Sequence, residues 1–226
     1  MLSGRLKCRR SSAYSNVPYT ETKAFCRRSR RPIVRRLIAR RRYTIRVNTS
    51  DYGAVVYDLD GTLVRLAVNW NAAAADAVDA FDAAGVDVAG ADLWSLFERA
   101  PEHGLADDLE GILADHERRG AERSIRLSHA DRVADWEVPV GVCSLNASSA
   151  CRVALDRHDL LDHVDTVVGR DSVATHKPDP EPLLTAIDRL GADPSTALFV
   201  GDTERDERTA ARAGVAFEWV DEAPAP

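Results

Sequence analysis

The sequence predicts an α/β fold, namely a doubly wound parallel sheet with a small all-helical cap inserted after the first strand. Short apolar runs bounded by polar or turn residues recur along the chain, and amphipathic segments separate the later runs. A long stretch with only helical patterns separates the first two runs. At 226 residues, the chain can form one α/β domain with an insertion, or two small domains.

Five apolar runs have the length and composition of buried strands. Runs this short, alternating with helical periodicity, indicate a parallel sheet with helices on both faces. Residues 51–65 and 137–226 are therefore expected to form a Rossmann-like core. The runs are AVVY (54–57), VPVGVC (138–143), HVDTVVG (163–169), ALFVG (197–201) and VAFEWV (215–220). The helical segments between the later runs are 148–161, 180–191 and 204–214, the last ending at Gly214.

The region 66–136 has a different pattern, because amphipathic segments follow one another there and no strand is expected between them. An insertion of this size after the first strand is expected to form a cap over the carboxyl edge of the sheet. Its aromatic residues Trp70, Trp94 and Phe97 are expected in the core of the cap. The alternative is that Trp70 or His103 faces a substrate. The helical segments are 69–85, 91–100, 107–120 and 128–136.

Charge divides the chain into two parts. Residues 1–50 contain 15 Lys and Arg and one acidic residue, whereas residues 51–226 contain 15 basic and 35 acidic residues. Three interpretations of the basic segment stay open. The first is an arm that binds nucleic acid through its phosphates, and the second is an organellar transit peptide. The third is a disordered extension that is not natural coding sequence. In the third case the start lies closer to the domain, near Val47, since Met1 is the only methionine.

The acidic part is poor in lysine, since Lys177 is its only one. Such a composition suits a halophilic protein, because high salt screens the self-repulsion of the acids. A codon bias that favours Ala, Asp, Arg and Val is the simpler explanation, and both can hold. No run is long and apolar enough to span a bilayer. The four cysteines show neither a CxxC nor a Cys/His pattern, which indicates reduced thiols in a cytoplasmic protein.

Four of the apolar runs lead into reactive residue types at the edge of the sheet where α/β proteins bind ligands. A carboxylate can attack phosphorus, and a second one two residues later can serve as general acid and base. Mg²⁺ prefers oxygen ligands and would neutralise converging aspartates, while an ammonium and a hydroxyl would contact phosphoryl oxygens. The residues are, run by run, Asp58 and Asp60, then Ser144 and Asn146, then Lys177, then Gly201, Asp202 and Asp206.

These residues resemble the four ordered motifs of the haloacid dehalogenase superfamily of phosphohydrolases. The resemblance spans residues 54–220, and the place of the insertion is similar to that in the helical-cap subclass, which includes phosphoglycolate phosphatases and β-phosphoglucomutases. Dehalogenase members lack the second aspartate, so Asp60 favours phosphate chemistry. Many relatives have Asn directly after the second-motif Ser or Thr, whereas this chain has Ser144-Leu145-Asn146. The motifs are DLDGTL (58–63), Ser144, KPDP (177–180) and GDTERD (201–206).

The resemblance implies a role for each motif residue. Asp58 would be the nucleophile and Asp60 the acid and base. The phosphate-binding set would comprise Thr62, Ser144, Asn146 and Lys177, the Mg²⁺ ligands Asp58, Asp60 and Asp202, and the supporting residues Gly201 and Asp206.

Structural alternatives accompany these assignments. Asp58 and Asp60 could form a turn before Gly61, and Ser144 could cap the following helix. Lys177 could be a surface lysine, although this part of the chain otherwise uses arginine.

The sequence therefore predicts a Mg²⁺-dependent phosphomonoester hydrolase that forms an aspartyl-phosphate and acts on a small phosphorylated metabolite. A β-phosphoglucomutase-like phosphomutase is the alternative. A nucleic-acid-binding protein acting through residues 1–50 is a third hypothesis, and it leaves the motifs unexplained. No membrane partner is expected. Neither the substrate nor the oligomeric state can be deduced from the sequence.

Overall fold

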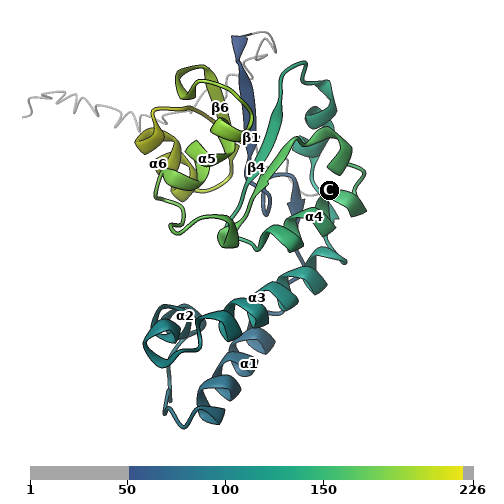
Figure 1. The fold of residues 1–226 in the computed structure, drawn as a ribbon. Coiled ribbons are helices and arrows are strands. Elements are labelled where there is room, and N and C mark those ends of the chain that lie inside the picture. Colours follow the sequence, from purple (N-terminus) through teal and green to yellow (C-terminus); the bar gives the residue numbers. More distant parts are fainter. Residues whose placement is uncertain (1–50, 221–226) are drawn as a thin grey trace, which may run out of the picture. The chain divides into compact units, whose positions relative to one another are not determined.

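The computed structural model describes residues 51–220, and within them a five-stranded parallel sheet has the order β5-β4-β1-β6-β7 (Figure 1). From β1 the chain first builds one side of the sheet and then the other, so the sheet is doubly wound. Each predicted apolar run contains a strand, and the predicted fold class is confirmed. The strands are β1 (Ala54–Tyr57), β4 (Val140–Cys143), β5 (Thr166–Val168), β6 (Ala197–Gly201) and β7 (Ala216–Trp219).

Helices cover both faces of the sheet. Successive side chains of a strand point to opposite faces, so Val55 and Tyr57 pack in one apolar core and Val56 in the other. Residues of α4 complete the first core, and residues of α5 and α6 complete the second. All four residues of β1 are buried, which fits a central strand of a covered parallel sheet. The helices are α4 (Ser148–Arg157), α5 (Glu181–Arg189) and α6 (Glu204–Ala213).

Three further helices form a second group with an apolar core of its own. Alanines and leucines at helical spacing pack around the fully buried Phe81. We call this group the helical unit, and its α3 packs along α4 (Figure 1). It comprises α1 (Trp70–Ala83), α2 (Leu93–Arg99) and α3 (Ala106–Ala121).

Two short strands were not expected from the sequence. β2 (Val64–Arg65) and β3 (Ile125–Arg126) pair antiparallel, so the expectation that no strand occurs in 66–136 is wrong. Two residues are too few to produce an alternating pattern. The segment that follows is a 3-10 helix, Ser128–Asp135, and it packs in the same core as β1 rather than in the helical unit. Other 3-10 helices are Ala100–His103, Leu161–His163, Arg170–Ser172 and Pro194–Thr196.

The expectation that Trp70 and Trp94 belong to an apolar core is also wrong. Their side chains lie at the surface of the helical unit, with 39% and 51% of Trp70 and Trp94 exposed. The buried face of α2 contains Leu93 and Leu96, so a residue at position 94 points elsewhere on the helix. Phe97 is partly buried against the core of the helical unit.

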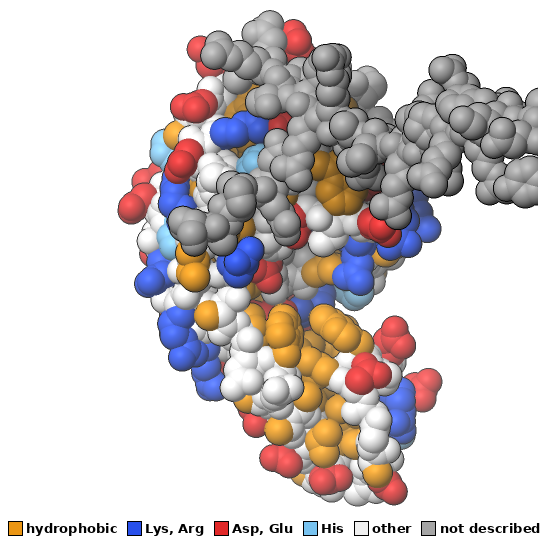
Figure 2. Space-filling model, turned by 180° about the vertical axis from the view of Figure 1, so that it is seen from behind, with side chains coloured by type: hydrophobic (Ala, Val, Ile, Leu, Met, Phe, Trp, Pro, Cys, Tyr) orange, Lys and Arg blue, Asp and Glu red, His pale blue; other side chains and the backbone are white. Residues whose placement is uncertain are grey.

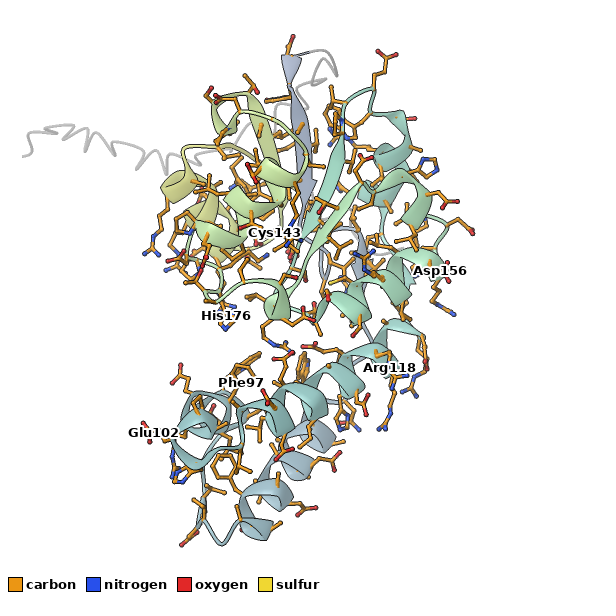
Figure 3. The ribbon with its side chains drawn as sticks, in the orientation of Figure 1. Phe97, Glu102, Arg118, Cys143, Asp156 and His176 are labelled. Atoms are coloured by element: carbon orange, nitrogen blue, oxygen red, sulfur yellow. The ribbon has the colours of Figure 1, made fainter. Side chains whose placement is uncertain are left out.

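The basic segment 1–50 lies outside the described residues. Among residues 51–220, no helix combines the length and the apolar character that crossing a membrane requires. Cys143 and Cys151 are buried free thiols, and burial raises the pKa of Cys143 to about 12. Figure 3 shows Cys143 within the sheet region.

Candidate active site

Most of the predicted site residues lie around one cavity of about 400 Å³ at the carboxyl edge of the sheet. It also receives residues from the helical unit and from the start of α6. Thr62, Gly201 and Asp202 do not line it. The predicted residues that do are Asp58, Asp60, Ser144, Asn146, Lys177 and Asp206.

Asp58 leaves the sheet directly after β1. Its backbone N–H donates to the carbonyl of Val200 at 2.8 Å, so the pairing of β1 with β6 fixes its position. Gly61 turns the chain back with a φ of +92°, and a Cβ at this position would lie 2.1 Å from Asp202 Oδ2. Only glycine meets both requirements here.

Lys177 is buried and holds two of the carboxylates. Its Nζ lies 2.7 Å from Asp58 Oδ1 and 2.6 Å from Asp206 Oδ1. Burial alone would lower the pKa of Lys177, but these carboxylates raise it above its usual value. Burial raises the pKa of Asp58 to about 7, since Lys177 offsets the effect only in part. Among the described residues none donates to Asp58 Oδ2, so this oxygen is available to a ligand.

Three carboxylates lie close enough to bind one metal ion. Asp58, Asp202 and Asp206 each offer an oxygen, and these atoms lie within 4.8 Å of one another. Burial, and then the neighbouring Asp206, raise the pKa of Asp202. When ionised, the cluster carries three negative charges against the single charge of Lys177. The donor set and the excess charge both fit a hard divalent cation such as Mg²⁺.

This cluster differs from the predicted metal set, because it contains Asp206 and not Asp60. The carboxylate of Asp60 instead accepts a hydrogen bond from the backbone N–H of Leu66 at 2.8 Å. Burial raises the pKa of Asp60, which suits a group that must carry a proton part of the time. Thr62 donates to Asp202 Oδ1 at 3.3 Å and so orients that carboxylate.

Ser144 and Asn146 contact each other at the end of β4, and both are buried. The hydroxyl of Ser144 donates to Asn146 Oδ1 at 3.1 Å, and the Asn146 backbone N–H donates to Ser144 Oγ at 3.2 Å. Ser144 is not the cap of the next helix, because Ala147 occupies the N-cap position of α4. Without a ligand, the Ser144 hydroxyl therefore bonds to Asn146 in the loop that borders the cavity.

The GDTERD motif (201–206) is compact because Gly201 allows Asp206 to lie close to it. Thr203 caps α6 and exchanges hydrogen bonds with Asp206, whose Oδ2 accepts from the Thr203 hydroxyl. A Cβ on Gly201 would lie 2.7 Å from Cβ of Asp206. Glycine therefore allows α6 to start close enough for Asp206 to reach Lys177.

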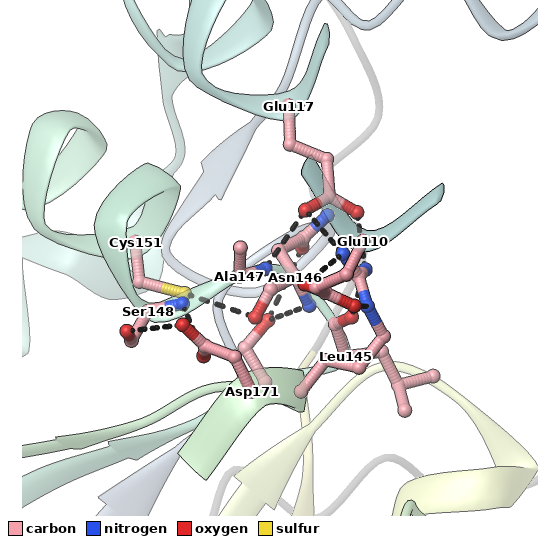
Figure 4. A network of polar contacts seen from close by, with 10 residues as sticks. Glu110, Glu117, Leu145, Asn146, Ala147, Ser148, Cys151 and Asp171 are labelled. Carbon is pink, nitrogen blue, oxygen red and sulfur yellow. Dashed lines mark hydrogen bonds and ion pairs between the residues drawn. The ribbon is translucent and has the colours of Figure 1, made fainter. Parts of the chain in front are cut away.

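A buried ionic network beside the cavity was not predicted from the sequence (Figure 4). Arg170 Nη1 donates to Glu117 Oε1 at 2.6 Å, and Arg170 Nη2 donates to Glu110 Oε1 at 2.9 Å. The other oxygen of Glu117 accepts from the backbone N–H of Ala147 at 2.8 Å, and Arg170 also donates to the Leu145 carbonyl. Burial opposes the charge of Arg170, but the two glutamates raise its pKa. The network joins α3 to the loops after β4 and β5.

One sequence signal points to this network. Glu110 and Glu117 are seven residues apart on α3, which places both on the same face of the helix. The partner Arg170 is distant in the sequence and carries no motif of its own.

The fold and the site together define an α/β enzyme with an acidic, lysine-containing centre at the carboxyl edge of a parallel sheet. Residues 55–220 match the haloacid dehalogenase-like hydrolase family, and the chain belongs to that family. This confirms the family predicted from the motifs.

Relatives and solved structures agree with this result. Phosphoglycolate phosphatase of Rhodospirillum rubrum is 33% identical over 72% of this chain and 76% of its own length. The phosphoglycolate phosphatase of Cereibacter sphaeroides is 31% identical over 72% of this chain and 82% of its own length. A subfamily IA hydrolase of the superfamily from Geobacter sulfurreducens has a TM-score of 0.53 and 27% identity, and the match covers 77% of this chain and 92% of that one. CbbY from Rhodobacter sphaeroides in complex with phosphate has a TM-score of 0.58 at 18% identity over 74% and 85%, which shows the fold alone. The family and the relatives confirm the predicted enzyme class, a phosphatase.

Proposed function

We propose that the protein is a Mg²⁺-dependent phosphomonoester hydrolase that acts on a small phosphorylated metabolite with Asp58 as nucleophile. The observation that carries this proposal is the position of Asp58. One carboxylate oxygen is held by Lys177, and the other is free of described donors at the edge of a cavity. A carboxylate held in this way can form a bond to phosphorus.

The residues around Asp58 supply the remaining steps. Asp58 Oδ2 attacks phosphorus and the bond from phosphorus to the ester oxygen breaks, while Asp60 gives its proton to the departing alcohol. Asp60 then removes a proton from a water molecule that attacks phosphorus, which releases inorganic phosphate and restores Asp58. Lys177 and Ser144 contact the phosphoryl oxygens, where negative charge is concentrated in the transition state.

Asp58, Asp202 and Asp206 would hold the Mg²⁺ ion. When bound, the ion neutralises charge on the phosphoryl group and allows it to approach the carboxylates. In this proposal Thr62 orients Asp202, Gly201 permits the position of Asp206, and the helical unit is the cap that closes over the substrate.

We place the enzyme in a high-salt cytoplasm. The support is the excess of acidic residues and the single lysine in residues 51–226. Such a surface is less self-repulsive when salt screens it.

The test is release of inorganic phosphate from a panel of phosphomonoesters, with Mg²⁺ or with chelator, at low and at molar KCl. We expect metal-dependent release, fastest at molar KCl, that is lost in Asp58→Asn. The control Asp156→Asn changes an exposed aspartate of α4 (Figure 3) and should retain activity. Absence of release from every ester by a folded protein that binds Mg²⁺ would contradict a phosphatase and favour a phosphomutase.

A further inference from the structure

The cavity has an aromatic wall that the reaction itself does not use. Trp70 and Trp94 line the same cavity as Asp58 and Lys177, although they belong to the helical unit. Their ring centroids lie 6.2 Å apart with a tilt of 44°, and Phe97 contacts Trp94 edge to face at 6.4 Å. Figure 2 shows hydrophobic side chains gathered on the helical unit. The two indoles thus form one apolar surface inside the site.

This surface is not explained by packing within the chain. Both indoles are substantially exposed, while the core of the helical unit is complete without them. Exposed large apolar surface is unfavourable in water, and grouped aromatic residues in a cleft are typical of ligand sites. Phosphoglycolate, a two-carbon phosphorylated acid, has no apolar face for such a surface to contact.

The part of the cavity contributed by α6 is polar. Glu204, Arg205 and Arg208 lie in the first turns of this helix and line the cavity. None of the described residues forms an ion pair with Arg205 or Arg208. These guanidinium groups and the carboxylate supply both donors and acceptors. A ligand with an apolar face and polar edges satisfies both parts of the cavity.

We infer that the substrate is a phosphomonoester whose leaving alcohol carries a planar heteroaromatic ring, as a nucleoside does. Its phosphoryl group lies at Asp58 and Lys177, and its ring stacks on Trp70 and Trp94. Ring edges then contact the side chains at the start of α6. This inference rests on the proposed function, because it places the ring relative to the reacting phosphoryl group.

The first test compares two esters that differ only by the base. Adenosine 5′-monophosphate and ribose 5-phosphate share the phosphoryl group and the sugar, and phosphoglycolate serves as the small aliphatic ester. We expect kcat/KM for the nucleotide to exceed both others by about tenfold or more, which is the scale of base stacking on an aromatic side chain. Equal turnover of the three esters would overturn the inference and leave the proposed function intact. No release from these three esters, with release from others of the panel, would also overturn the inference, whereas no release from the whole panel would contradict the proposed function.

The second test changes the aromatic wall. In Trp70→Ala and in Trp94→Ala, the preference for the nucleotide over ribose 5-phosphate should fall by about tenfold. Trp94→Phe should restore part of it. The control is Trp219→Ala, since Trp219 is 43% exposed on β7 and does not line the cavity. An unchanged preference in both cavity variants, with the melting temperature retained, would overturn the inference.

Discussion

Asp58 is buried at the end of a buried strand, where an uncompensated carboxylate is unfavourable. Lys177 supplies one compensating charge and contacts Asp58 and Asp206 at once. The three clustered carboxylates still exceed this charge. The cluster therefore has an excess of negative charge that a cation would neutralise, and this excess is the physical basis of the proposed Mg²⁺ site.

Replacing Lys177 by Met should lower kcat/KM by about 10²–10³, the loss typical of removing one group that stabilises transition-state charge. Lys177→Arg should not restore activity, because a planar guanidinium does not replace a compact ammonium between two carboxylates. Steady-state phosphate release measures the effect. The control Arg152→Met removes an exposed cation of α4 and should leave kcat/KM unchanged. Retained activity in Lys177→Met would exclude the role given to this lysine.

Gly201 and Gly111 offer a matched pair of substitutions. Gly201→Ala places a Cβ 2.7 Å from Cβ of Asp206, so we expect a loss of about 1–3 kcal/mol in unfolding free energy. Gly111→Ala meets no atom within 4 Å at an exposed position of α3 and should stabilise by about 1 kcal/mol. Urea unfolding measures both. Equal effects of the two changes would show that close approach does not matter at Gly201.

At this scale the sequence was informative because the chemistry is local. Asp58, Ser144 and Asp202 were expected to converge because the strands that precede them end at one edge of a sheet. The prediction placed Asp60 in the metal set and Asp206 in a supporting role, whereas the acidic cluster contains Asp206. That difference depends on the direction of each side chain, and Asp60 turns towards the backbone of Leu66.

At the scale of elements, the network of Glu110, Glu117 and Arg170 connects the helical unit with the loops that follow β4 and β5. It was not predicted from the sequence. Each residue taken alone looks like an exposed charge, and only the folded chain brings Arg170 to α3. The exposure of Trp70 and Trp94 could not be predicted for a similar reason. Helical spacing does not show which residues of a helix contact the core.

Arg170→Met should lower the unfolding free energy by about 3–5 kcal/mol, because it leaves Glu117 buried without its counter-ion. Chemical denaturation provides the measurement. Changing Glu117 to Met in the same chain should recover part of the loss, since the fully buried carboxylate is then gone and only the partly exposed Glu110 lacks its counter-ion. Arg118→Met is the matched control. Arg118 pairs with Asp115 at the surface of α3, the helix that also carries Glu117, and such a pair contributes little to stability. A loss in Arg170→Met no larger than in the control would contradict this account.

At the scale of the whole molecule, folding stability should depend on Mg²⁺ and on pH together. Burial raises the pKa of Asp58 from 3.8 to about 7 in the metal-free protein. A carboxyl whose pKa is raised by folding stabilises the fold below its unfolded pKa, and this stabilisation is lost as the pH rises through the folded pKa. A bound cation replaces the proton, so Mg²⁺ should stabilise the fold more at high pH than at low pH.

Thermal unfolding with and without Mg²⁺, at about pH 5.5 and about pH 8, measures this dependence. We expect a larger gain in melting temperature at the higher pH. In Asp58→Asn the gain should be smaller and should vary less with pH. The same gain at both pH values in the unmodified protein would contradict the assignment of the cluster as a metal site.

The doubly wound sheet could be predicted because burial on both faces leaves a clear pattern of apolar runs. The packing of α3 along α4 could not be predicted, since no local pattern encodes a contact between these two helices.

The proposed attack by Asp58 would leave a phosphoryl group on its side chain, which mass spectrometry of protein quenched with acid during turnover can detect. We expect a mass increase of one phosphoryl group on the peptide that contains Asp58. The signal should need Mg²⁺, be stronger in Asp60→Asn, where attack by water is slowed, and be absent in Asp58→Asn. Steady release of phosphate with no phosphorylated Asp58 in either the unmodified protein or Asp60→Asn would contradict it.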